Sequence, residues 1–333
     1  MSRLNLGYAC INMTLGKLDI TTNRTMRKKT LEAKGMEYVN ELALKNVKDL
    51  QKIVEWNTSM GIKLFRISSD VFPWMGEYEL NELESYLEIC DIMDDIGRMA
   101  TNANQRLTMH PGHFNCLGSP NPKVVEKTIK ELNQHSEQFD MMGFDPSPYN
   151  KINIHVGGTY GDKEKTLDRF CTNFETLDKN TQWRLTVEND DKASGFSVKD
   201  LYEGIYKRVG IPIVFDYFHH KFNTGDLSEQ EALDLASQTW PEGITQCCHY
   251  SESRQEEKKD QKIKKTAHSD LIYSNIECYD KDLDIVVEAK HKELAVLNYG
   301  GPISYIESKE IETSVFDGKE FNKSYPLKLE ENE

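Results

Sequence analysis

Histidines and carboxylates follow most of the short apolar runs in this chain. In the stretch LTMHPGHF, residues 107–114, an apolar run ends at His110, and a Pro-Gly turn then leads to His113 and Phe114. Comparable positions at or just after the other runs hold Asp70, His155, Glu188, Asp216, His219, His249 and Glu288. Taken singly, each could be a helix cap, a solvated loop residue or a satisfied buried histidine. Together, such a mixture of imidazoles and carboxylates suits divalent cations: Zn²⁺, Mn²⁺ or Mg²⁺.

The chemistry that needs such a set is metal-assisted hydrolysis. In a multinuclear site one ion activates water and another stabilises the leaving oxygen, which suits cleavage of a phosphodiester. Other mechanisms find less support. The sequence has no Gly-x-Ser-x-Gly nucleophile elbow, and GGTYG at 157–161 follows an apolar run but lacks the spacing of a phosphate-binding glycine loop.

The elements that must position these residues alternate along the chain. Apolar or β-branched runs predict strands at 3–9, 63–69, 106–110, 151–156, 183–188, 211–216, 244–249 and 283–288. Segments of helical period predict helices near 40–60, 81–99, 121–142, 163–178, 197–209 and 229–239. This alternation predicts a single α/β domain, a (β/α)₈ TIM barrel over 1–300, with a C-terminal extension over 301–333. A polar insertion at 250–282 replaces the helix between strands seven and eight. All the carboxyl ends of the strands then meet on one face, where active sites are built.

Composition adds further expectations. The 333 residues carry a formal net charge of −14, which argues mildly against a nucleic-acid ligand. Basic residues are nevertheless clustered in TTNRTMRKK (21–29) and RQEEKKDQKIKK (254–265), although the second is equally consistent with a solvated mixed-charge loop. No apolar run approaches a membrane span, and the N-terminus does not look like a signal peptide. Seven scattered cysteines without a C-x-x-C pair predict free thiols in a reducing intracellular compartment, the cytoplasm or, in a eukaryote, the nucleus.

The chain resembles the UV damage endonucleases, which are divalent-metal (β/α)₈ enzymes related in fold to endonuclease IV. The resemblance runs from about residue 4 to 292 and rests on motifs that occur in a fixed order. They are LGYACINMTL (6–15), TTNRT (21–25), FRISSDVFP (65–73), MHPGHF (109–114), IHVGGTYGDK (154–163), VEND (187–190), FDYFHH (215–220), CHYS (248–251), AHSD (267–270) and VEAKHKE (287–293). The resemblance implies a DNA repair enzyme that cuts immediately 5′ of a UV photoproduct in double-stranded DNA and leaves a 3′-hydroxyl.

The resemblance also assigns roles by position. The site would hold two or three divalent ions, and Mn²⁺ is the expected metal. The ligands would be His110, His155, Glu188, Asp216, His219, His249, His268 and Glu288. Asp70 stands where a family member may use His. Glu188 and Glu288 are the expected bridging carboxylates and, with His249, the catalytic group. Tyr8 and Asn12 match a pair that the family uses around the displaced nucleotides. His113 and Phe114 replace a Gln-Tyr pair that fills the gap at the lesion.

One departure concerns Cys247. The family can carry a lysine two residues before the histidine of the seventh strand, modified to a carbamate that helps to hold metals. A cysteine cannot form that carbamate, so the metal count or affinity could differ. Two alternatives stay open: a sugar isomerase or epimerase on the same barrel, and a damage-binding protein without catalytic activity. We expect a monomer that does not bind membranes.

Overall fold

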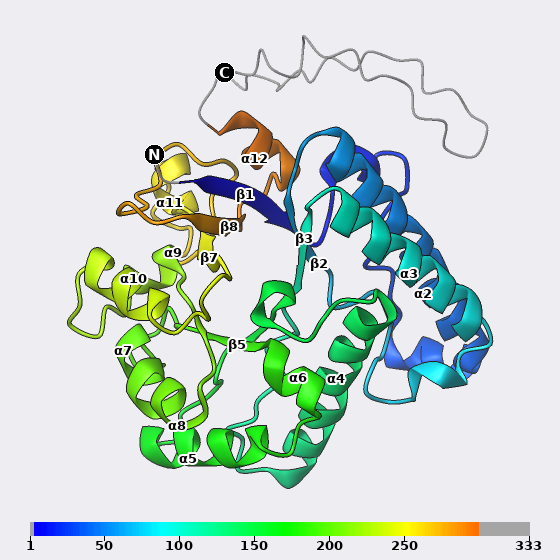
Figure 1. Cartoon of the computed structure of the whole chain (residues 1–333), viewed down its shortest axis with the longest axis horizontal. Helices are drawn as coiled ribbons and strands as arrows, with labels where there is room; N and C mark the ends of the chain where they lie inside the picture. Colours follow the sequence, from blue (N-terminus) through cyan, green and yellow to red (C-terminus); the bar gives the residue numbers. More distant parts are fainter. Residues whose placement is uncertain (1–2, 300–333) are drawn as a thin grey trace.

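The computed structural model describes residues 3–299, and its centre is a sheet of eight parallel strands. The strands pair in the order β6-β5-β4-β3-β2-β1-β8-β7, and a parallel bridge between Asp216 and His249 brings the two edges together, so that the barrel is nearly closed (Figure 1). Their bounds are β1 Leu4–Ala9, β2 Leu64–Ile67, β3 Arg106–Met109, β4 Ile152–Ile154, β5 Leu185–Glu188, β6 Ile213–Val214, β7 Gln246–Tyr250 and β8 Leu283–Val287. The predicted (β/α)₈ barrel is confirmed.

Helices surround the barrel on the outside, as Figure 1 shows. The longer ones are α2 Lys28–Ser59, α3 Tyr86–Asn102, α4 Pro122–Met141, α5 Lys163–Phe174 and α10 Glu229–Ser237. Shorter ones are α1 Met13–Gly16, α6 Lys179–Arg184, α7 Val198–Leu201, α8 Lys207–Val209, α9 Tyr217–His220, α11 Arg254–Lys258 and α12 Glu293–Asn298. Single turns are η1 Leu80–Glu82 and η2 Pro148–Asn150, and η3 Tyr202–Tyr206 is a π-helix.

Several boundaries differ from the sequence predictions, most clearly at three places. The helix expected from residue 40 begins at Lys28, with a break at Gly35, whose φ of 65° is outside the helical region. The helix expected at 197–209 is divided into α7, η3 and α8. A Cβ at Gly204 would lie 2.5 Å from Leu167, so glycine permits this close packing of η3 on α5. The first two residues of the strand expected at 183–188 belong to α6, where the buried Arg184 pairs with Asp140 at 2.7 Å.

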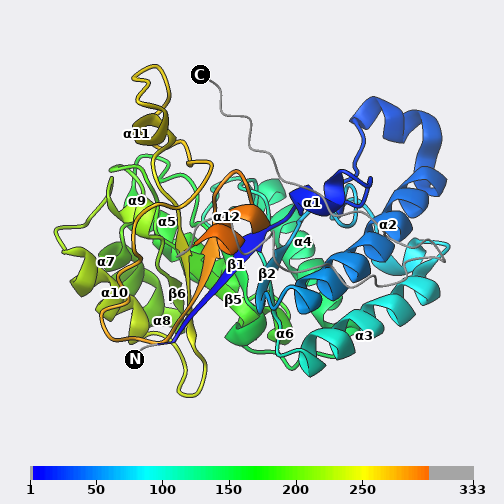
Figure 2. The same cartoon turned by 90° about the horizontal axis from the view of Figure 1, so that it is seen from above.

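The polar insertion between β7 and β8 is confirmed as a feature of the fold. It contains only the short helix α11 and otherwise irregular backbone, and it projects from the barrel beside α9 (Figure 2). The predicted extension at 301–333 lies outside the described residues, so the domain boundary stays a prediction. Within residues 3–299 no helix is both long and apolar enough to cross a bilayer. The seven cysteines all lie in this range, and none forms a disulfide.

Strand alternation decides which side chains enter the barrel. Successive side chains of a strand point to opposite faces of the sheet. In β4 and its flanks, Ile152 and Ile154 belong to the apolar layer around the barrel, whereas Lys151, Asn153 and His155 alternate with them. These three contact interior residues of other strands. The barrel interior therefore contains a polar layer, and the part of it at the carboxyl ends of the strands forms the site.

Candidate metal centre

Three strands bring His110, Glu188 and His249 together at the carboxyl-end face of the barrel. His110 directly follows β3, Glu188 ends β5, and His249 lies near the end of β7. The Nε2 atom of His110 lies 3.2 Å from Glu188 Oε2, and the Nδ1 atom of His249 lies 3.1 Å from the same oxygen. One potential ligand atom from each residue lies within 4.8 Å of the others, which is close enough to hold one ion.

A second group shares the carboxylate of Glu188. His155 Nε2 lies 3.8 Å from Glu188 Oε2, and His219 Nδ1 lies 3.3 Å from Oε1. One potential ligand atom from each of these three residues also lies within 4.8 Å of the others. Glu188 thus faces two candidate ion positions at once, the arrangement required of a bridging carboxylate.

Glu288 and His268 extend the centre on the side of β8. Glu288 Oε1 lies 3.4 Å from His249 Nδ1, and Oε2 lies 3.7 Å from His268 Nδ1. Arg66 of β2 forms an ion pair with Glu288 Oε1. His268 comes from the insertion, so a segment outside the regular barrel completes this side.

Asp216 holds one oxygen towards the centre. Its Oδ1 accepts a hydrogen bond from the backbone N–H of His219 at 2.7 Å and so caps α9. Its Oδ2 is buried, has no hydrogen-bond partner among the described residues, and lies 3.8 Å from His219 Nδ1. An unpartnered carboxylate oxygen in the interior is costly, and coordination of a cation would remove that cost.

The ionisation of the residues also fits a cation centre. Burial alone would raise the pKa of Glu188, but the charge of His155 and the hydrogen bonds from His110 and His219 hold it well below its usual value. Burial would lower the pKa of His219, but the carboxylates of Asp216 and Glu188 raise it to about 11. Burial lowers the pKa of His249 to about 4, so this imidazole is neutral near pH 7 and has a lone pair to donate. Nδ1 of His249 lacks a hydrogen bond within the described chain. The donor set therefore fits divalent ions.

Besides Arg66, three further residues that support the centre were missed by the sequence reasoning. Asn153 donates a hydrogen bond to Glu188 Oε2, Asp190 Oδ1 lies 3.0 Å from His155 Nδ1, and Lys151 Nζ lies 3.2 Å from His249 Nε2. Lys151 is fully buried, and this burial lowers the pKa of its amine to about 8. The period of two from Lys151 through Asn153 to His155 was a signal that could have found Lys151 and Asn153. Such outer contacts orient ligands and tune their basicity.

Tyr8 and Asn12, which were predicted to lie around the displaced nucleotides, pack inside the protein, in β1 and shortly after it. Both are completely buried. The Tyr8 hydroxyl donates to Asn57 at 2.7 Å and accepts from Asn12 at 2.9 Å, and Asn12 also caps α1 through Leu15 N–H. These hydrogen bonds fix the chain after β1, and the role of the pair at a nucleotide stays a prediction.

Asp70 is not brought into the centre. It is exposed and belongs to neither His/Glu group. Burial of its carboxyl raises its pKa, and Glu131 adds to that rise while His135 opposes it. Asp70 therefore lies near α4, which carries both of those neighbours, and its role as a metal ligand stays a prediction.

His113 and Phe114 occupy an exposed turn beside the centre. Phe114 is 77% exposed, and its ring centroid lies 4.0 Å from that of His113. A large aromatic ring left in water, four residues after His110, is available to a ligand. The placement of this pair above the centre and its contact with DNA stay predictions.

Cys247 is a buried small side chain in the barrel interior. It packs with Ala9, Leu64 and Val286, and burial raises the pKa of its thiol. It belongs to neither His/Glu group. These surroundings favour a neutral thiol over a metal-binding thiolate.

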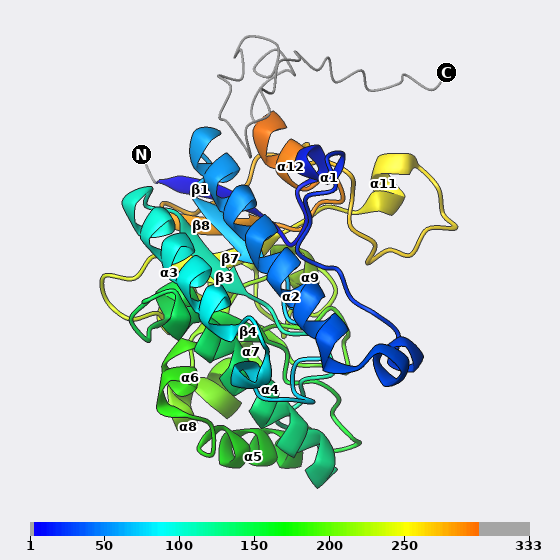
Figure 3. The same ribbon diagram turned by 90° about the vertical axis from the view of Figure 1, so that its right-hand side faces the viewer.

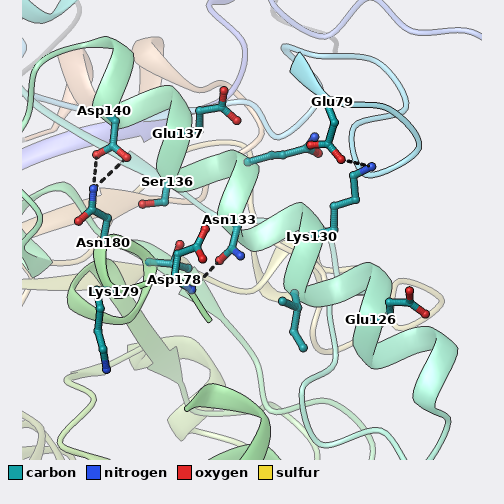
Figure 4. Close-up of a pocket in the computed structure, with 13 residues that line it drawn as sticks. Glu79, Glu126, Lys130, Asn133, Ser136, Glu137, Asp140, Asp178, Lys179 and Asn180 are labelled. Atoms are coloured by element: carbon teal, nitrogen blue, oxygen red, sulfur yellow. Dashed lines mark hydrogen bonds and ion pairs between the residues drawn. The ribbon is translucent and has the colours of Figure 1, made fainter. Parts of the chain in front are cut away.

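A surface cavity of about 680 Å³ lies elsewhere, between α4, α6 and the segment before α3. Figure 4 shows its charged lining, in which Lys130 pairs with Glu79 at 2.8 Å and Asn180 donates to Asp140. Its five carboxylates outnumber its two lysines, so it would repel a phosphodiester. None of its lining residues belongs to the metal centre.

The fold and the centre define a class: a (β/α)₈ barrel whose carboxyl-end face carries a His/Glu centre suited to divalent ions. The profile of the UV-endonuclease UvdE family matches residues 4–317. The chain belongs to this family.

Relatives and solved structures agree with that membership. A UV-damage endonuclease of Schizosaccharomyces pombe is 39% identical over 310 residues, which cover 88% of this chain and 50% of that one, so the chain spans half the length of that relative. A putative UV-damage endonuclease of Acanthamoeba polyphaga mimivirus is 32% identical and covers 98% of each chain. The crystal structure of SacUVDE matches with a TM-score of 0.76 and 32% identity over 89% of this chain and 96% of that one. Endonuclease IV from Thermus thermophilus, at 13% identity and a TM-score of 0.53 over 88% and 96% of the two chains, shares the fold.

Proposed function

We propose that this protein is a metal-dependent DNA repair endonuclease that hydrolyses the phosphodiester immediately 5′ of a UV photoproduct, leaving a 3′-hydroxyl and a 5′-phosphate. The observation that carries the proposal is the pair of His/Glu groups sharing Glu188, in a chain of the UvdE family. We further propose that it acts as a monomer on double-stranded DNA.

The residues around Glu188 would hold two or three ions. His110, Glu188 and His249 form one position, and His155, Glu188 and His219 form another. Asp216, Glu288 and His268 would complete the coordination, with Mn²⁺ as the expected metal and Zn²⁺ or Mg²⁺ as alternatives. When bound, such ions supply an activated water and a positive charge that stabilises the leaving oxygen.

The chain's own residues would then set the geometry of the reaction. Glu188 and Glu288 would provide the negative charge that holds the cations, and both have pKa values held well below normal by neighbouring cationic groups. His249 is completely buried, so water does not compete for its Nδ1 atom. These three residues are the proposed catalytic group.

Lesion selection would come from His113 and Phe114. A photodimer already pairs and stacks weakly, so flipping it out of the duplex costs less than flipping normal bases. The two exposed rings would fill the vacated space by stacking.

A single end-labelled duplex with one defined pyrimidine dimer tests the proposal. We expect one cut at the 5′ side of the dimer, a product that a DNA polymerase extends directly, and no cut in the undamaged duplex. EDTA should stop the reaction, and Mn²⁺ should restore it. Full cutting in EDTA would exclude the metal mechanism. A shift of the damaged duplex without cutting would indicate a binder instead of an enzyme.

A further inference from the structure

The insertion between β7 and β8 carries a basic cluster that the metal centre does not use. Its residues 254–265, which we call the basic arm, contain six basic and three acidic side chains in a chain whose net charge is −14. Arg254 and Lys258 are neutralised by Asp270, at 3.5 and 2.7 Å. The remaining cations are exposed: Lys259, Lys262, Lys264 and Lys265. No carboxylate among residues 3–299 forms an ion pair with any of these four.

The basic arm is built by its own hydrogen bonds. Arg254 N–H donates to Ala267 O at 2.8 Å, and the Gln255 side chain donates to Ile263 O at 2.6 Å. Ser253 caps α11 and also pairs with His268 in an antiparallel bridge. These contacts give the lysines a defined position on a folded hairpin.

The base of the arm is part of the metal centre. His268 Nδ1 lies 3.0 Å from the backbone oxygen of Glu288, next to the Glu288 carboxylate. Figures 2 and 3 both show α11 and its loop projecting from the barrel on the side of α1, which follows the carboxyl end of β1. A substrate held across the centre would therefore pass beside the exposed lysines.

A second projection stands on the same side of the molecule. The beginning of α2 extends outward in both views and carries Arg27, Lys28 and Lys29, all exposed. Two basic projections on the face of an otherwise acidic protein match a long polyanion better than a small ligand.

We propose that the basic arm binds the phosphate backbone of duplex DNA beside the lesion, through Lys262, Lys264 and Lys265. This proposal rests on the proposed nuclease function. Phosphate contacts position a protein on DNA without reading its sequence, so the arm adds affinity for damaged and intact duplex alike. Lesion choice stays with the exposed rings of His113 and Phe114.

The test compares two triple variants of the full chain loaded with Mn²⁺. Lys262→Gln/Lys264→Gln/Lys265→Gln removes three charges from the arm and leaves its hydrogen-bonded base unchanged. The matched control, Lys179→Gln/Lys207→Gln/Arg208→Gln, removes three exposed charges from helices that precede β5 and β6, at the opposite end of the barrel. Binding of damaged and undamaged duplexes is measured from about 50 to 200 mM salt, together with bound metal.

We expect the arm variant to lose affinity for both duplexes by the same factor, roughly tenfold or more, with the slope of log affinity against log salt reduced by about two to three. Its metal content should equal that of the parent, and the control should match the parent throughout. If the parent cuts damaged DNA and the arm variant keeps the salt slope of the parent, the proposal for the arm is overturned and the nuclease function stands. A loss confined to damaged duplex would also overturn it, because the arm would then be reading the lesion. A parent that neither binds nor cuts DNA would overturn both proposals.

Discussion

The two ends of the barrel interior use buried charge in opposite ways. At the amino end, Arg106 of β3 is almost completely buried, and every nitrogen of its guanidinium donates a hydrogen bond. Its acceptors are Tyr149 O at 2.6 Å, Thr245 O at 2.8 Å, Pro148 O at 2.9 Å and Asp284 Oδ2 at 2.9 Å. At the carboxyl end, buried atoms of Asp216 and His249 have no hydrogen bond among the described residues. A saturated network stabilises a fold, whereas an unsaturated one leaves room for a ligand.

The largest effect should follow from Glu188→Gln. The amide keeps the shape of the side chain but cannot neutralise two cations, so incision should fall by roughly a thousandfold or more. Circular dichroism should show an intact fold, and metal analysis should show the loss of bound ions. The exposed Glu175→Gln serves as the control and should behave as the parent. Unchanged nicking by Glu188→Gln would remove the bridging assignment.

Arg106→Met tests the amino end. The change leaves Asp284, which is 3% exposed, without its main cationic partner, and breaking a buried pair in this way costs about 3–5 kcal/mol of unfolding free energy. Urea unfolding should show this loss, while the metal bound per folded molecule stays the same. If Arg106→Met lowered metal content at constant stability, the two ends would not be separate in function.

Lys151→Met tests the region between the two ends of the barrel, because Lys151 contacts the proposed ligand His249 on its side towards the amino end. Replacing the amine by an apolar group of similar volume should not harm the fold. Removing an outer contact of a metal-binding histidine should weaken metal affinity or activity by about ten- to a hundredfold. Titration of the apo-protein with Mn²⁺ measures the effect. Parent-like affinity would show that His249 does not depend on Lys151.

Phe114→Ala should weaken binding of dimer-containing duplex by about tenfold to a hundredfold, with His113→Ala less severe, because stacking contributes roughly 1–3 kcal/mol per base. Metal content should not change, and binding should recover when the lesion lies opposite a gap. Trp183→Ala removes an aromatic ring that is 65% exposed on α6 and should have no effect. Equal binding and cutting by Phe114→Ala would place the wedge elsewhere.

Cys247→Ala should have the smallest effect. The thiol is buried among apolar side chains and stays protonated, so its removal should leave the Mn²⁺ dependence of incision unchanged. A shift in metal preference from zinc towards manganese in this variant would instead show that the sulfur had been a ligand.

The sequence alone determined the barrel and the types of residue at the carboxyl ends of its strands. Alternating strands and helices predicted the fold, and the positions of His110, His155 and Glu188 at the carboxyl ends of predicted strands assigned them to one end of the barrel. Strand ends were less certain. The β5 boundary was wrong by two residues, because the buried ion pair of Arg184 holds the preceding segment in a helix.

Only the tertiary structure decided which of these residues meet. The stagger between strands brings Lys151, which precedes β4, to His249 of β7, although 98 positions separate them in the chain. The structure also shows that Glu188 faces both His/Glu groups, and that Tyr8 and Asn12 form a hydrogen bond with each other in the interior. A sequence specifies the face on which a side chain lies through local backbone geometry. The partner on that face depends on the register of strands distant in sequence, which only the closed barrel fixes.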